Sequence, residues 1–177
     1  MKINLTIALG LAAGLALAAT SATAQIKNAP SGTMAKADQT FMNDAIEGDL
    51  SEIDMGKLAQ QKGQSEGVKQ FGQMLEQDHG QHLQKAKQTA EQLGLTAPSE
   101  PNAKQKSMYG HLSSLSGAQF DGEFAKDMAA DHKEDISKYQ KQAKSRGPLG
   151  DFAQQTIPTL QKHLQTAESL NSQQSKR

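Results

Sequence analysis

Four long stretches of this chain repeat apolar residues at steps of three, four or seven positions. Steps of that size return to one face of an α-helix. In the stretch at 65–94, for example, the apolar residues include Val68, Phe71, Leu75 and Leu93, and polar residues fill the other face. Nowhere do β-branched residues alternate with polar ones, as they do in a strand. The sequence therefore predicts an all-α fold.

Helix start and stop signals divide the chain. The predicted helices span about 35–63, 65–94, 117–146 and 148–173, with a short one at 102–115. Ser65 suits an N-cap, Gly94 the position after a helix end, and Pro148 a first turn. The spacing from Ser116 to Gln119 suits a capping box.

These helices are long enough to form a bundle. A helix of about 28 residues is about 42 Å long. Tight connections at 63–65 and 146–148 predict two hairpins, and the link at 95–116 is long enough to run the length of the bundle. We therefore expect a ferritin-like antiparallel four-helix bundle over 35–173, with two helical hairpins joined by a crossover that contains a short extra helix, followed by a tail at 174–177. An up-down-up-down bundle is the alternative if the link folds back locally.

The first residues have the pattern of a secretory signal. A cationic start precedes an apolar run at 5–19, which is shorter than the about 20 residues of a membrane span. Ala22 and Ala24 then fit the small-x-small cleavage rule. We expect a signal peptide at 1–24, a disordered lead-in at 25–34, and a mature protein in the bacterial periplasm, with secretion as the alternative and no stable membrane insertion after cleavage.

Composition excludes several classes of function. Basic and acidic residues both number 19, so the chain lacks the positive charge typical of nucleic-acid binders. It has no cysteine, which excludes disulfides, thiolate metal sites and a cysteine nucleophile. It carries no phosphate-binding loop, dinucleotide fingerprint or Gly-x-Ser-x-Gly motif. Its acidic residues are spread along the helices and are interpreted as solvated faces.

An internal repeat relates the second long helix to the third. At an offset of 53 residues, Phe71 falls on Phe124 and His79 falls on His132. Both helices end at a glycine about 15 residues beyond the histidine. The two histidines are therefore expected at the same height in the bundle, both facing the interior.

Two more polar residues lie at mid-helix, so that each long helix supplies one. These residues are Glu52, His79, His132 and His163. They form either a buried, hydrogen-bonded polar layer, which the sequence favours, or a site for a divalent transition metal, since imidazole suits such ions. His82, one turn beyond His79, is expected at the shoulder of this group, and His111 at the surface.

A standard di-iron site fits the sequence poorly. Ferritin-like iron proteins use two lone glutamates and two Glu-x-x-His pairs. Glu76 and His79 have that spacing, but Ala129 and Leu160 stand where two further carboxylates are needed. A ferritin-type oxidase or peroxidase is disfavoured for this reason.

The order of short motifs along the chain also carries a resemblance. The motif residues are Phe41, Ala45, Gly48, Glu52-Ile53, Gly56 and Leu58-Ala59, then Val68, Phe71-Gly72, Met74-Leu75 and Asp78-His79, then Phe120, Phe124, Met128 and Asp131-His132, and last Pro158, Leu160 and His163-Leu164. Over about 38–170 the chain resembles the domain of unknown function 4142 family of exported bacterial proteins. The resemblance implies a ferritin-like bundle and export, and little chemistry.

The preferred interpretation is an exported helical bundle of unassigned activity. The sequence leaves enzymatic activity open and favours a non-enzymatic protein, acting in envelope stress or through an unidentified protein partner. The alternative is a periplasmic metal-binding protein that uses the mid-bundle glutamate and histidines. No nucleic-acid partner and no certain cofactor are expected.

Overall fold

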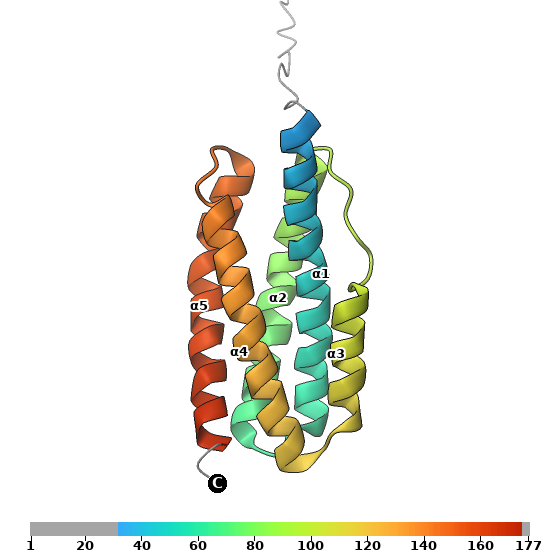
Figure 1. The fold of residues 1–177 in the computed structure, drawn as a ribbon, viewed down its shortest axis with the longest axis vertical. Coiled ribbons are helices and arrows are strands. Elements are labelled where there is room, and N and C mark those ends of the chain that lie inside the picture. The colour runs from blue at the N-terminus through green and yellow to red at the C-terminus, as the bar shows by residue number, and fades with distance from the viewer. Residues whose placement is uncertain (1–31, 175–177) are drawn as a thin grey trace, which may run out of the picture. The chain divides into compact units, whose positions relative to one another are not determined.

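The computed structural model describes residues 32–174, which form five helices and no strand (Figure 1). The helices are α1 (Gly32–Lys62), α2 (Glu66–Gln92), α3 (Ala103–Ser114), α4 (Gly117–Gln142) and α5 (Pro148–Gln174). The predicted all-α class is confirmed. Helix α1 begins three residues before the predicted start, and α4 ends four residues before the predicted end. The expected signal peptide at 1–24 and lead-in residues 25–31 lie outside the described residues.

The four long helices form two antiparallel hairpins, α1 with α2 and α4 with α5 (Figure 1). Helix α2 packs against α5, and α1 against α4. The link after α2 descends beside α1 and includes α3, so α4 starts at the same end of the bundle as α2 (Figure 1). This is the predicted crossover, and the up-down-up-down alternative is wrong. None of the described helices is long and apolar enough to span a membrane.

The helix ends follow their local sequence with one exception. The Ser65 side chain accepts a hydrogen bond from the Val68 amide, as an N-cap does. Asn102 and Gln105 form a capping box at the start of α3. The capping box predicted at Ser116 is wrong, because that side chain makes no capping bond. The residue after it is a glycine with a left-handed φ of 61°, which departs from a regular first helical turn.

The turn between α1 and α2 is tied to α4 by a buried carboxylate. The Asp121 side chain accepts hydrogen bonds of 2.8 Å from the backbone amides of Gln64 and Ser65. Charge-assisted bonds of this kind are stronger than neutral ones. Asp121 thereby fixes where the first hairpin meets the second.

Two glycines let α1 and α2 approach closely. A Cβ atom on Gly56 would lie 2.5 Å from the backbone oxygen of Gly72, and one on Gly72 would lie 2.6 Å from the oxygen of Gly56. Neither position has room for a side chain. This contact lies less than two turns from Glu52, so it sets the spacing of the two helices near the polar centre.

The interior consists of two apolar clusters with a polar layer between them. The cluster near the α1–α2 turn includes Met55, Leu58, Phe71, Leu75, Phe124 and Met128. The cluster at the other end includes Phe41, Ile46, Ala86, Tyr139, Phe152 and Leu160. The buried polar residues between them include Asp49, Glu52, His79, His132, Thr156 and His163. Water is therefore kept from the polar layer on both sides along the bundle axis.

Candidate metal centre

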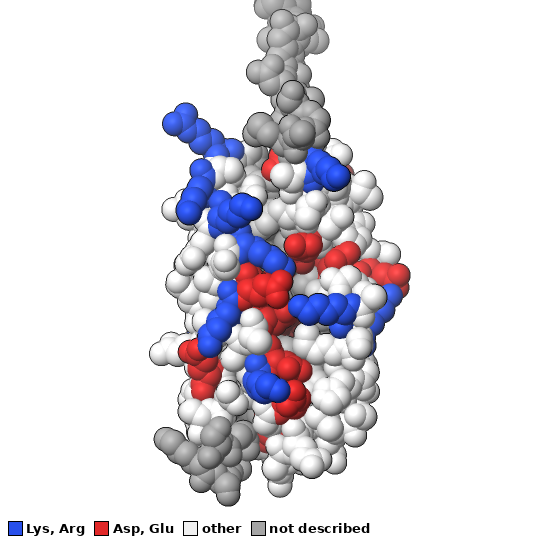
Figure 2. Space-filling model, in the orientation of Figure 1, with Lys and Arg blue, Asp and Glu red and all other residues white. Residues whose placement is uncertain are grey.

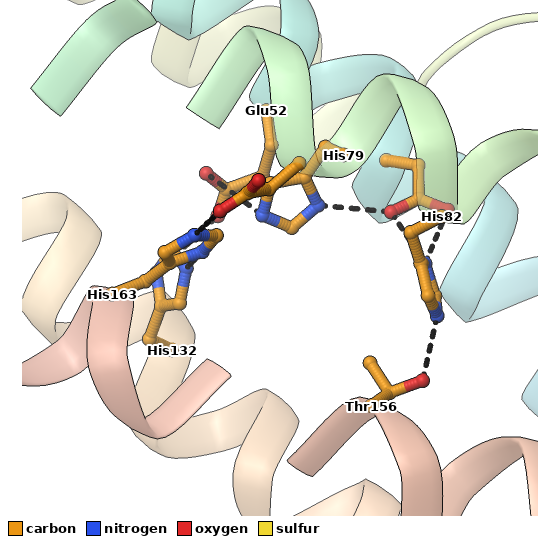
Figure 3. Close-up of polar contacts among 8 residues, drawn as sticks. Glu52, His79, His82, His132, Thr156 and His163 are labelled. Carbon is orange, nitrogen blue, oxygen red and sulfur yellow. Dashed lines mark hydrogen bonds and ion pairs between the residues drawn. The ribbon is translucent and has the colours of Figure 1, made fainter. Parts of the chain in front are cut away.

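Three imidazoles from three helices meet in the polar layer (Figure 3). His79 comes from α2, His132 from α4 and His163 from α5, and their exposed fractions are 5%, 0% and 0%. Each offers one nitrogen, and the three nitrogens lie within 4.8 Å of one another. The prediction that His79 and His132 both face the interior is confirmed.

Two of the rings are held from outside by carboxylates. His79 Nδ1 lies 2.9 Å from Asp49 Oδ1, and His163 Nε2 lies 2.9 Å from Asp78 Oδ2. Because a carboxylate only accepts, each of these nitrogens carries the hydrogen. In the neutral ring, the opposite nitrogen then bears a lone pair. Carboxylates of this kind commonly orient histidines that bind metals.

The third ring is held by the backbone. His132 Nδ1 donates to the carbonyl oxygen of Met128, one turn earlier on α4, at 2.9 Å. Its other nitrogen, Nε2, therefore bears a lone pair in the neutral ring and lies 3.2 Å from Nδ1 of His163. Two acceptor nitrogens thus face one another, and neither supplies a hydrogen to the other.

Burial keeps these two rings neutral. It lowers the pKa of His132 to about 3, helped by the neighbouring His79 and His163, against the opposing effect of the Met128 carbonyl. Burial also lowers the pKa of His163 to about 4, again helped by His79, while Asp78 opposes the shift. At neutral pH both rings therefore present lone pairs, the form that ligates a metal.

Glu52 of α1 lies beside the histidines. Its Oε1 is 3.5 Å from His132 Nδ1, and its Oε2 is 3.9 Å from His79 Nε2. Within residues 32–174, neither oxygen of an ionised Glu52 has a hydrogen-bond donor, and His79 Nε2 has no partner either. Burial, together with the negative charges of Asp131, Asp135 and Asp49, raises the pKa of Glu52 well above its usual range. The ionised form of Glu52 is therefore destabilised, and a cation nearby would stabilise it.

His82 belongs to the edge of this group, as predicted. Its Nδ1 lies 2.7 Å from Asp49 Oδ2, and its Nε2 lies 3.0 Å from Thr156 Oγ1 (Figure 3). Its ring stacks on Phe152, with centroids 4.7 Å apart. Asp49 therefore holds both His79 and His82 in place. Sequence reasoning missed Asp49 and Thr156, although Asp49 lies one turn from Glu52 on the same helix face.

The structure also shows where the other residues considered for the site lie. All four predicted residues, one per long helix, lie in the polar layer, and the three histidines form its closest group. Glu76 is directed elsewhere, since it accepts a 2.7 Å hydrogen bond from Gln60. The buried Ala129 and Leu160 supply no carboxylate. His111 lies exposed on α3.

A pocket of about 120 Å³ lies between α2 and α5, beside the centre. Its walls include His79, His82, Thr156, Thr159 and His163. His132 is not part of these walls, so it forms the buried back of the group. The pocket therefore lies on the side of the centre away from α4, next to ring nitrogens that are themselves buried.

The charged residues on one face of the bundle form partly exposed ion pairs. Figure 2 shows acidic side chains at the middle of one face with lysines and arginines around them. Lys138 lies 2.9 Å from Glu134 and 3.6 Å from Asp44, and Lys104 lies 3.5 Å from Glu134. These partly exposed pairs link α1, α3 and α4. They fit the interpretation of solvated faces, where single ion pairs contribute little stability.

Comparisons with known proteins place this geometry in a family context. The family described as Domain of unknown function (DUF4142) matches residues 23–170 of the chain. Among solved structures, a DUF305 fragment from Deinococcus radiodurans superposes with a TM-score of 0.68, covering 77% of this chain and 96% of that chain at 14% identity. That likeness shows the fold alone. No curated protein matches the chain.

Proposed function

The chain belongs to the DUF4142 family, and we propose that it binds one divalent transition-metal ion between His79, His132 and His163. The observation that carries the proposal is the convergence of three ring nitrogens whose opposite nitrogens are all engaged as donors. Three imidazoles from three helices form a ligand set for zinc, copper, nickel or iron.

The spacing of one pair of nitrogens matches a metal ion of this class. Zinc–nitrogen bonds are about 2.0–2.1 Å long, so two ligands of a tetrahedral site lie about 3.3 Å apart. His132 Nε2 and His163 Nδ1 are 3.2 Å apart. Without an ion, two facing lone pairs at this distance repel each other, whereas a shared cation turns the contact into an attraction.

The unpaired atoms favour a metal site over a purely structural polar layer. A self-sufficient layer would pair its buried polar atoms, because an unpaired buried group costs about 1–3 kcal/mol. Among residues 32–174, Nε2 of His79 has no hydrogen-bond partner, and an ionised Glu52 has no donor for either oxygen; only a protonated Glu52 can pair, by donating to Asp131. A dication at the histidines provides His79 Nε2 with a partner and gives Glu52 an opposite charge nearby. We assign Glu52 this charge-balancing role.

We further propose that the protein works outside the cytoplasm, in the bacterial periplasm. The support is the cationic start, the short apolar run and the Ala22-x-Ala24 cleavage pattern. Mass spectrometry of the protein from the periplasmic fraction should find an N-terminus at Gln25. A chain that keeps Met1 and stays with the membranes would contradict export with cleavage.

Metal uptake by protein purified without a histidine tag tests the metal proposal. After equilibrium dialysis against zinc, copper or nickel, the wild type should retain about one equivalent. His132→Gln should lose it, and His111→Gln, a change of the same kind at an exposed position, should keep it. Absence of uptake, or equal uptake in the wild type and both variants, would contradict the metal proposal and leave the histidines as a structural polar layer.

A further inference from the structure

The pocket between α2 and α5 lies beside a centre in which three histidines would leave one coordination position of the metal ion unfilled. Three protein ligands leave one position of a tetrahedral ion unfilled, and structural metal sites close that position with a fourth side chain. Catalytic sites leave it open to water or substrate. The question for this protein is therefore which group reaches the fourth position.

The nearby carboxylates do not fill it. Asp49 and Asp78 hold the outer nitrogens of His79 and His163, so their oxygens lie on the far side of those rings. Glu52 lies 3.9 Å from His79 Nε2, and its other oxygen faces the outer nitrogen of His132. It stands beside the three-nitrogen group rather than completing it.

The pocket lies against two of the three rings, while the ring nitrogens themselves are buried. His79 and His163 are part of the pocket wall, whereas His132 closes the back. The wall also contains Thr156, Thr159 and Asp78, whose carboxylate holds the outer nitrogen of His163. Its volume of about 120 Å³ holds several waters, since one water needs about 10–15 Å³ of such space.

We infer that the fourth coordination position of the bound ion faces this pocket and takes a small polar ligand from solvent, either water or a small anion. This inference rests on the proposed metal binding and narrows it to an ion that is open to exchange. The size of the pocket excludes large organic ligands. Lys85 and Asp78 are both in the wall, so the route of an incoming ligand carries one positive and one negative side chain.

Cobalt(II) protein titrated with azide tests the inference, because the visible spectrum of cobalt(II) reports the ligands and geometry of the ion. Cobalt uptake is measured first. Absence of uptake would overturn the metal proposal and this inference together. Uptake followed by a saturable change of the cobalt spectrum on adding azide is the expected result. Uptake with no spectral response to azide would overturn the open position while leaving metal binding intact.

Three variants locate the route and the fourth ligand. Thr159→Trp fills the pocket at an exposed wall position and should weaken azide binding about tenfold or more, while Gln161→Trp, exposed on the same helix and outside the wall, should not. Equal azide affinity in both variants would overturn the pocket route. Glu52→Gln protein that has taken up cobalt should also respond to azide, at least as strongly as the wild type, because the change removes a negative charge beside the ion. Azide binding that appears only in Glu52→Gln would identify Glu52 as the fourth ligand and overturn the inference.

Discussion

Nε2 of His132 and Nδ1 of His163 lie 3.2 Å apart at the centre of the bundle, although α4 and α5 reach this point from opposite directions. Each ring uses its other nitrogen as a donor, His132 to the Met128 carbonyl and His163 to Asp78. A positive charge between these two nitrogens would therefore stabilise their contact. A metal ion supplies that charge at neutral pH, where the lowered pKa values of both rings disfavour an added proton.

The same pKa values predict how stability depends on pH in metal-free protein. The ordinary histidine pKa of 6.5 applies to the unfolded chain, and the folded value for His132 is about 3. Between these values the unfolded state binds the proton more readily, so stability is present above about pH 6.5 and is lost as the pH falls toward 3. The maximum loss is about 1.4 kcal/mol per pH unit for one histidine.

Comparison with His132→Gln isolates this contribution. With a chelator present, the difference in unfolding free energy between wild type and variant should shrink steadily from pH 7 to pH 4 in urea titrations. A difference that stays constant over this range would show that the His132 ring is not held neutral by burial.

Asp49 should control metal affinity without touching the metal. Its carboxylate holds His79 and His82, and replacing it by asparagine weakens both bonds while keeping the shape of the side chain. Loss of such a supporting carboxylate typically lowers affinity about 10–100-fold. A competition assay with a zinc chelator should find this decrease in Asp49→Asn and no change in Asp54→Asn, an exposed position on the same helix. Unchanged affinity in Asp49→Asn would mean that His79 does not bind the metal.

The close approach of α1 and α2 predicts opposite effects for two glycine substitutions. Gly56→Ala places a Cβ atom 2.5 Å from a backbone oxygen and should destabilise the protein by about 1–3 kcal/mol. Gly80→Ala meets nothing within 4 Å and should stabilise it by up to about 1 kcal/mol, because alanine favours helix. Thermal unfolding of both variants checks the pair. Equal shifts in the same direction would show that the packing at Gly56 is looser than described.

Asp121 should matter for the hairpin turn. Asp121→Ala leaves the amides of Gln64 and Ser65 without their acceptor and should cost about 1–3 kcal/mol for each amide that stays buried. The exposed Asp54→Ala serves as the control. Hydrogen exchange at the two amides should speed up in Asp121→Ala, and unchanged protection there would contradict the assigned role.

Much of the centre was accessible from sequence because its residues follow helical periodicity. The 53-residue repeat placed His79 and His132 at equal heights. Glu52 and His163 were identified because they lie near the middle of the first and last long helices. In a bundle of long helices, residues at the same height along their helices lie in one layer across the bundle. The fold followed from the same pattern together with the length of the crossover link.

The supporting residues could not be found in this way. Asp49 looks like any acidic residue on a solvated helix face, and its burial depends on how α1 packs against α2 and α4. Thr156 is polar in an apolar stripe, and its contact with His82 joins helices 74 positions apart in sequence. The failed cap at Ser116 depends on the backbone of Gly117, which the spacing of side chains does not reveal.

X-ray absorption at the zinc edge of the tag-free, zinc-loaded protein tests the central claim most directly, because it reports the atoms bound to the ion. We expect zinc–nitrogen distances of about 2.0–2.1 Å with the outer-shell scattering of three imidazoles, and the loss of one imidazole in His163→Gln. A first shell made only of oxygen, or a spectrum unchanged in His163→Gln, would contradict a metal held by His79, His132 and His163.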